Sequence, residues 1–161
     1  MEKELIDAAD DLLTACRVRG WTVATAESCT GGMVAAALTA IAGSSDVMDR
    51  GFVTYTNEAK NEMIGVPMDL FETVGAVSED VAKAMAEGAM KTANVDLACG
   101  ITGVAGPGGG SKEKPVGLVH IAAASKAKTI HERCQFDGDR HAVRLSSALK
   151  ALEMLRRLAE K

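Results

Sequence analysis

The chain has 161 residues, of which 47% are hydrophobic and 25% are charged, and it carries a net charge of −4 at pH 7. This length suits one domain with one sizeable core, and the composition is that of an ordinary globular protein. The negative charge and an aromatic content of 3% argue against a nucleic-acid binder. No apolar run approaches the roughly 20 residues that cross a bilayer, so no membrane association is expected.

Apolar spacing and turn residues predict an alternation of helices and strands. In chain order, the pattern predicts a helix over 3–19, a strand over 21–26, a turn at 27–30, a helix over 31–42, a strand over 51–56, a short helix from Asn57, a helical piece over 67–73, a helix over 79–92, a strand over 96–102, a glycine loop over 103–111, a strand pair over 117–124 and 129–136, and a helix over 139–160. No repeat or linker divides the chain. The prediction is therefore an α/β fold in which residues 1–161 form a single domain, a layered sheet flanked by helices.

The four cysteines are scattered, without a C-x-x-C motif or Cys/His pairs at metal-ligand spacing. They indicate no metal site and favour a reducing, cytoplasmic setting. The acidic, amphipathic N-terminus does not resemble a signal peptide.

Residues 25–60 contain the densest group of chemically active side chains. Ser/Thr-rich turns surround one apolar helix, and the only tyrosine, Tyr55, precedes Lys60 by five residues. Hydroxyls, a phenol and an amine are the groups that a nucleophilic hydrolase uses when it has neither metal nor histidine. Each single Ser or Thr here also suits a helix cap or a turn.

The segment I-T-G-V-A-G-P-G-G-G-S at residues 101–111 follows a strand predicted to be buried. Its five glycines in eight residues let backbone N–H groups approach a ligand, which makes Gly103, Gly106 and Gly108 candidates for substrate binding. The segment is neither a P-loop nor a dinucleotide fingerprint. On spacing alone, a mobile connection is an equal alternative.

A Ser-His-Asp triad is not indicated. His120 lies within a predicted strand, His131 lies in a charged strand, and His141 begins the last helix. No G-x-S-x-G motif is present. Among the acidic residues, Glu27, Asp46 and Asp49 are candidate carboxylates, although an Asp at a helix start is more often a cap.

Six motifs in order resemble one known family. These are TAESCTGG, AGSS, RGFVTYTNEAK, GAVSE, GITGVAGPGGGSKEKPVG and FDGDR, and they cover about residues 5–158. In these motifs the chain resembles the CinA C-terminal-domain family, the nicotinamide-nucleotide amidohydrolases. The larger CinA proteins carry an additional N-terminal domain, for which this sequence has no room. The chain therefore resembles the stand-alone form.

The resemblance implies deamidation of nicotinamide mononucleotide to nicotinic acid mononucleotide and ammonia. It also implies an α/β fold, a homo-oligomer, and neither a metal nor an organic cofactor. For the site, it implies that Ser45 of AGSS is the nucleophile and that Tyr55 and Lys60 assist it. The implied substrate pocket includes Ser28, Thr102 and Arg140.

General chemistry agrees with this implication. A serine hydroxyl needs a base, and a lysine can serve only when a lowered pKa leaves it neutral. Tyr55 is expected to relay the proton between Lys60 and the serine or to hold the geometry. Backbone amides at 43–45 or in the glycine loop are candidates for stabilising the oxyanion.

Two alternatives stay open at this stage. Cys29 is a second candidate nucleophile, because it sits at a helix start where a thiol pKa is lowered. A non-catalytic nucleotide sensor is the other, with the glycine loop binding phosphate and no turnover. The presence of a base beside a hydroxyl favours an enzyme, since binding alone needs no base.

Overall fold

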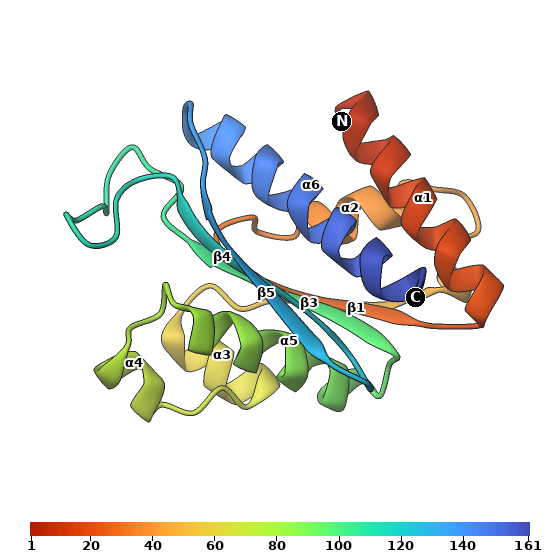
Figure 1. Ribbon diagram of the computed structural model, residues 1–161, viewed down its shortest axis with the longest axis horizontal. Helices are drawn as coiled ribbons and strands as arrows, with labels where there is room; N and C mark the ends of the chain where they lie inside the picture. The colour runs from red at the N-terminus through yellow and green to blue at the C-terminus, as the bar shows by residue number, and fades with distance from the viewer.

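A five-stranded mixed sheet in the order β2-β1-β3-β4-β5 forms the centre of the structure, a computed structural model that describes residues 1–161 (Figure 1). Its strands are β1 (Val23–Glu27), β2 (Met48–Val53), β3 (Leu97–Gly103), β4 (Leu118–Ser125) and β5 (Thr129–Gln135). The strand β1 pairs in parallel with both β2 and β3, whereas β4 and β5 are antiparallel additions. The predicted α/β fold is confirmed.

Helices cover both faces of the sheet (Figure 1). The helices are α1 (Lys3–Arg19), α2 (Met33–Thr39), α3 (Asn57–Ile64), α4 (Asp69–Thr73), α5 (Glu79–Ala93) and α6 (Arg140–Ala159). Figure 1 shows α1, α2 and α6 on one face and α3, α4 and α5 on the other. The first face holds a core of 26 buried residues, and the second holds a smaller core of 11 that includes Met85 of α5 and Ile64 of α3.

The helix boundaries follow from local signals in the sequence. Gly20 ends α1 in the left-handed conformation, with φ of 66°, which glycine adopts without strain. Ser78 and Asp139 cap α5 and α6 by accepting hydrogen bonds from Val81 N and Ala142 N. These signals explain why the long helices agree with the predicted ranges.

The strands β3 and β4 are buried along almost their whole length, as the predicted burial of β3 on both faces requires. The strand β2 differs from the prediction, because it begins at Met48 and ends at Val53 rather than spanning 51–56. It is an edge strand, and an edge position tolerates the exposed Asp49 and Arg50 that made its first half resemble a loop. A short 3₁₀ helix, η1 (Ser44–Asp46), precedes it.

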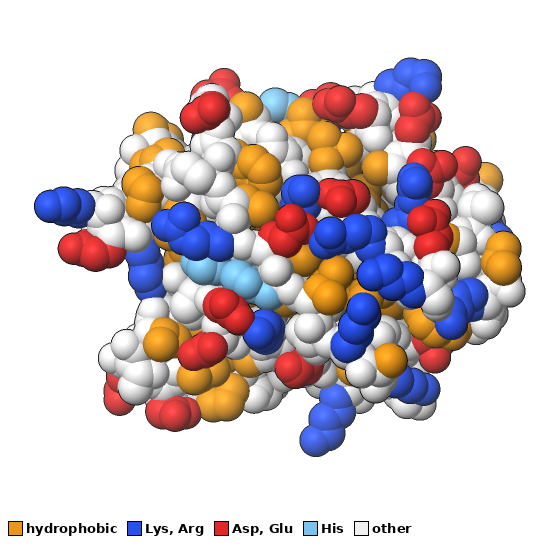
Figure 2. All heavy atoms as spheres, viewed as in Figure 1, with side chains coloured by type: hydrophobic (Ala, Val, Ile, Leu, Met, Phe, Trp, Pro, Cys, Tyr) orange, Lys and Arg blue, Asp and Glu red, His pale blue; other side chains and the backbone are white.

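None of the helices combines the length and apolar character needed to cross a membrane. Figure 2 shows acidic and basic side chains interleaved over the face that carries α6 and β5.

Candidate functional site

A buried serine–lysine pair lies where β1 and β2 end. Ser28 directly follows β1, and Lys60 lies in α3, a helix capped by Thr56. The Nζ atom of Lys60 is 3.2 Å from Ser28 Oγ and 3.1 Å from the backbone oxygen of Tyr55. The two side chains are thus within hydrogen-bonding distance, which a nucleophile and its base require.

The environment of Lys60 favours its neutral form. Its side chain is only 1% exposed, and no carboxylate forms an ion pair with it. Burial lowers the pKa of Lys60, because the charged form loses its hydration; the nearby Cys29 thiol opposes this shift weakly. A lysine held in this way is suited to accept a proton.

The turn that carries Ser28 is fixed from two sides. The fully buried Glu27 carboxylate accepts hydrogen bonds from Thr30 Oγ1 at 2.7 Å and from Val34 N at 2.9 Å. From α6, Arg144 donates to the backbone oxygens of Cys29 and Thr30 at 3.0 and 3.1 Å. These bonds join β1, α2 and α6, and they hold the Ser28 backbone rigidly.

Sequence reasoning assigned no such role to Glu27 or Arg144. The position of Glu27 beside Ser28 is a local signal, but its three hydrogen-bond donors become visible only in the fold. Arg144 is 115 positions from Cys29, and no local signal in the sequence indicates their contact.

Tyr55 and Arg140 connect the site to the glycine loop. The Tyr55 side chain is 59% exposed, and its hydroxyl oxygen lies 3.3 Å from Arg140 Nη2. Arg140 also donates to the backbone oxygen of Gly106 at 2.6 Å. The phenol therefore bonds to neither Ser28 nor Lys60, and the expected proton relay through it is not present in this arrangement. Only the Tyr55 backbone oxygen contacts the amine.

Thr102, a residue of β3, lies beside Ser28. Glu27 pairs with Ile101 in the parallel ladder, and Ser28 N continues it by donating to Ile101 O at 3.1 Å. This register brings Thr102 next to Ser28. The Thr102 hydroxyl donates to the backbone oxygen of Ala76 at 2.8 Å, so it also ties the strand to the segment before α5.

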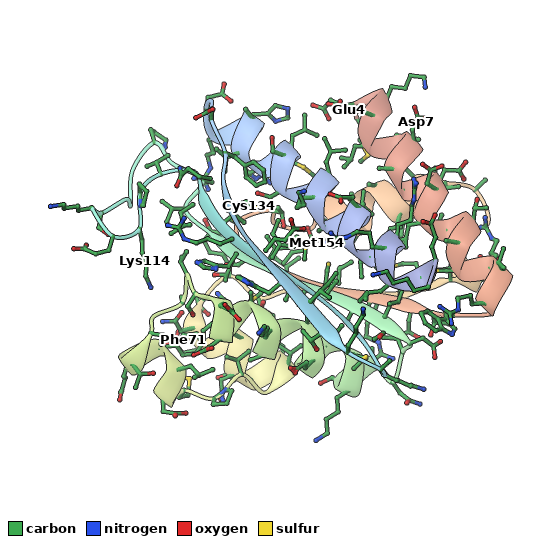
Figure 3. All side chains as sticks on the ribbon, in the orientation of Figure 1. Glu4, Asp7, Phe71, Lys114, Cys134 and Met154 are labelled. Carbon is green, nitrogen blue, oxygen red and sulfur yellow. The ribbon has the colours of Figure 1, made fainter.

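The glycine loop begins where β3 ends, and side-chain bonds tie the loop and the segment after it to other parts of the fold. Gly103 packs closely against Val119 of β4, Gly106 has φ of +83°, and Gly108 has open space around it. Arg140 bonds to Gly106 O within the loop, and Lys114, three residues beyond the loop, has its Nζ 2.6 Å from the backbone oxygen of Val74. Figure 3 shows Lys114 extending from the connection between this loop and β4 toward α4. The loop thus lies over the same end of the sheet as Ser28.

Ser45 lies apart from this cluster. It belongs to η1, which precedes β2, whereas Tyr55 and Lys60 follow β2. A strand of six residues spans about 20 Å, so Ser45 and Lys60 lie toward opposite ends of β2. Ser45 lines a separate groove of about 330 Å³ between α2 and β2. The expected pairing of Ser45 with Lys60 is not seen in the structure, where Lys60 bonds to Ser28 instead.

Cys29 and the histidines do not form a second catalytic arrangement. Burial raises the pKa of the Cys29 thiol to about 11, which keeps it protonated and unreactive near neutral pH. His120 Nδ1 and His131 Nε2 lie 2.9 Å apart, and burial, followed by the neighbouring His131, lowers the pKa of His120 to about 4. His141 pairs with Glu2 at the surface. No histidine is hydrogen-bonded to Ser28 or Lys60.

A buried serine hydrogen-bonded to a lysine that has no ion-pair partner, at the carboxyl ends of the parallel strands, defines the site of a candidate serine hydrolase. The family model described as the CinA C-terminal domain matches residues 6–159. The chain belongs to the CinA C-terminal domain family, and the resemblance inferred from the six motifs is confirmed.

Similar proteins fall into two groups by length. The nicotinamide-nucleotide amidohydrolase PncC of Escherichia coli K12 is 51% identical over 155 residues, which are 96% of this chain and 94% of that protein. The protein of the same name from Enterobacter agglomerans is 48% identical over 153 residues. A CinA-like protein of Syntrophobacter fumaroxidans is 53% identical over 142 residues, but the match spans only 34% of its length. This chain therefore corresponds to about a third of the longer relatives.

A solved structure agrees with the fold over almost the whole chain. The competence/damage inducible protein CihA from Agrobacterium tumefaciens has a TM-score of 0.95 and 48% identity, covering 98% of this chain and 97% of that one.

Proposed function

We propose that this protein hydrolyses the carboxamide of nicotinamide mononucleotide, with Ser28 as the nucleophile and Lys60 as its base. The observation that carries the proposal is the 3.2 Å contact between Ser28 Oγ and a buried lysine amine that has no ion-pair partner. The names of the full-length relatives in Escherichia coli and Enterobacter agglomerans support the substrate and the reaction.

The first half of the reaction forms an ester. The neutral Lys60 amine takes the hydroxyl proton of Ser28, and the freed electron pair on Oγ bonds to the carboxamide carbon. The tetrahedral intermediate then collapses as the Lys60 ammonium returns the proton to the leaving nitrogen. Ammonia departs, and the pyridine acyl group stays on Ser28.

The second half uses water. Lys60 accepts a proton from the water as its oxygen bonds to the ester carbon, and it returns that proton to Ser28 Oγ as the acid leaves. The products are nicotinic acid mononucleotide and ammonia, and the enzyme regains its starting protonation.

The oxyanion of the intermediate needs hydrogen-bond donors. The backbone N–H groups of Cys29 and Thr30 follow Ser28 directly, and neither donates to a backbone oxygen. We assign this role to them rather than to the backbone N–H groups of residues 43–45, because residues 43–45 precede β2 whereas Ser28 lies where β1 and β2 end.

The glycine loop and Arg140 would hold the phosphate of the nucleotide. Arg140 is an exposed cation that already bonds to Gly106 O, and the loop contributes backbone N–H groups beside it. Gly103, Gly106 and Gly108 allow the close approach that such binding needs. Thr102, next to Ser28, would line the part of the pocket that receives the pyridine ring.

The decisive experiment incubates the purified protein with nicotinamide mononucleotide and a metal chelator. We expect ammonia and nicotinic acid mononucleotide in equal amounts. Binding of the nucleotide without ammonia release would instead identify a sensor, and the hydrolase proposal would be abandoned.

A further inference from the structure

Two threonine hydroxyls in the sheet are fully buried and have no hydrogen-bond partner. They are Thr25 Oγ1 and Thr54 Oγ1, and no other buried side-chain nitrogen or oxygen lacks a partner. An unpaired buried hydroxyl lowers stability, because it gives up its bonds to water without replacement. Such a group needs an explanation, and Thr54 has a functional one.

Thr54 lies next to the serine–lysine pair. Val53 pairs with Glu27 in the ladder, and Thr54 N donates to Glu27 O at 2.8 Å, so Thr54 stands beside Ser28. Side chains alternate along the strand, so Thr54 shares the face of Phe52, which packs in the core with Ile64 of α3. Thr54 is also the chain neighbour of Tyr55, whose backbone oxygen accepts a bond from Lys60.

The hydrogen-bonding capacity of Lys60 changes during the reaction. The neutral amine has two N–H donors and one lone pair, and the ammonium has three donors and no acceptor. The protein supplies two partners, Ser28 Oγ and Tyr55 O. With a side chain only 1% exposed, Lys60 has little access to water for a third partner.

We propose that the Thr54 hydroxyl accepts the third hydrogen bond of the Lys60 ammonium once Lys60 has taken the proton of Ser28. This inference deepens the proposed function and rests on it for the chemical step. The Ser28 O–H bond breaks, a third N–H bond forms on Lys60, and Thr54 turns about χ1 to receive it. Thr54 thus acts through Lys60, as a positioning residue that stabilises its charged form.

No charged side chain is placed to take this role. The Cys29 thiol is the one titratable group with an electrostatic effect on Lys60, and it is held protonated by its own burial. On α3 itself, Glu58 and Glu62 are exposed. On α5, Glu87 and Lys91 line a groove at the far end of α3 with residues 61–65.

Thr25 provides a matched control. It has the same orphan hydroxyl and the same burial, but it lies in β1 on the other face of the sheet. There its Oγ1 approaches Gly51, beside Ala35 of α2. A Thr→Val change at either position replaces the hydroxyl with a methyl group of similar size and keeps the shape of the side chain.

The test measures the pKa of Lys60 directly. Lysine labelled with ¹³C at Cε is titrated by NMR in the wild type and in Thr54→Val, Thr25→Val and Thr54→Ser, and the Lys60 signal is assigned by its loss in Lys60→Met. We expect Thr54→Val to lower the pKa of Lys60 by about one unit or more, since a hydrogen bond to a charged group is lost. Thr25→Val and Thr54→Ser should leave it unchanged.

The direction of the change in the pKa of Lys60 distinguishes this role from a purely structural one. If Thr54 only filled space, Thr54→Val would leave the pKa unchanged, and loosened packing would admit water and raise it. Either result overturns the proposal. Deamidation assays on the same variants, run at a pH above the pKa of Lys60 so that the amine is neutral in each, should give a fall of up to about tenfold in kcat for Thr54→Val alone, because the weaker base takes the Ser28 proton less readily.

The titration does not require turnover. Should the wild type fail to release ammonia while Thr54→Val still lowers the pKa of Lys60, the substrate assignment fails and the role of Thr54 stands. If the wild type deamidates the nucleotide but Thr54→Val leaves the pKa of Lys60 unchanged, the substrate assignment stands and the role of Thr54 fails.

Discussion

Ser28 and Lys60 are 32 positions apart in the chain, yet Ser28 Oγ and Lys60 Nζ lie 3.2 Å from each other. The contact depends on two structural conditions. The parallel pairing of β1 and β2 ends both strands at the same edge, and the Thr56 cap starts α3 immediately beyond it. Because α3 returns over that edge, its fourth residue reaches Ser28.

The first prediction compares two serines. Ser28→Ala should lower kcat by at least about 10³-fold, because it removes the nucleophile. Ser45→Ala should stay within about threefold of the wild type, since Ser45 lies in another groove. Ammonia release on matched preparations, with circular dichroism to verify folding, decides between them. Loss of activity in Ser45→Ala with retention in Ser28→Ala would restore the assignment that the family resemblance implies.

The contrast between these serines shows what the sequence can and cannot predict. Hydroxyls, Tyr55 and Lys60 were identifiable as a group because they are close in sequence and match the family motifs. Which serine pairs with Lys60 could not be predicted in this way. Ser45 and Lys60 are separated by an extended strand, whereas Ser28 and Lys60 are brought together by the register of the sheet. Chain proximity was a poor guide to contact here.

The fold was easier to predict than the site. Gly20 and Ser78 give local stop and start signals, and the apolar run in β3 reports its own burial. Arg144 and Thr54 carry no such signal. The first acts across 115 positions, and the second is distinguished only by a missing partner, which is a property of the folded state.

The second prediction concerns Lys60 as a base. Lys60→Arg should lower kcat by at least about 10³-fold relative to the wild type, because a guanidinium stays protonated at every usable pH. In the wild type, activity should rise with pH through a pKa below the value of about 10.4 that a free lysine has, since burial lowers the pKa of Lys60. A pH–rate profile tests this, and an active Lys60→Arg enzyme would rule out the lysine as base.

The same shift predicts how stability depends on pH. Between the lowered pKa of folded Lys60 and about 10.4, the unfolded chain binds a proton that the folded protein does not. The free energy of unfolding contributed by Lys60 therefore rises with pH across this window. Lys60→Met should flatten that rise in denaturant titrations at successive pH values, and an identical slope in both proteins would contradict the burial of the amine.

The third prediction concerns Cys29. Its thiol, with a pKa raised to about 11, should react slowly with iodoacetamide at pH 8, and Cys29→Ala should keep most of the wild-type activity. The measurements are the rate of alkylation by mass spectrometry and kcat for the variant. Rapid alkylation with parallel loss of activity would favour the cysteine mechanism.

The last prediction concerns the phosphate of the substrate. Arg140 lies between Tyr55 and Gly106 of the glycine loop, and it is the cation proposed to meet the phosphate. Binding energy from the phosphate would orient the amide at Ser28, so truncated substrates should lose turnover as well as affinity. We expect kcat/KM to fall at least about 100-fold from the mononucleotide to the riboside, and further to free nicotinamide. Arg140→Gln should weaken the mononucleotide reaction by a comparable factor while leaving the riboside reaction nearly unchanged, because only the former contains the group that Arg140 binds. Lys114→Gln is the matched control, because the Lys114 amine donates to Val74 O at the end of α4, whereas Arg140 contacts Tyr55 and the glycine loop. Equal kcat/KM values for riboside and mononucleotide would show that the glycine loop does not bind phosphate.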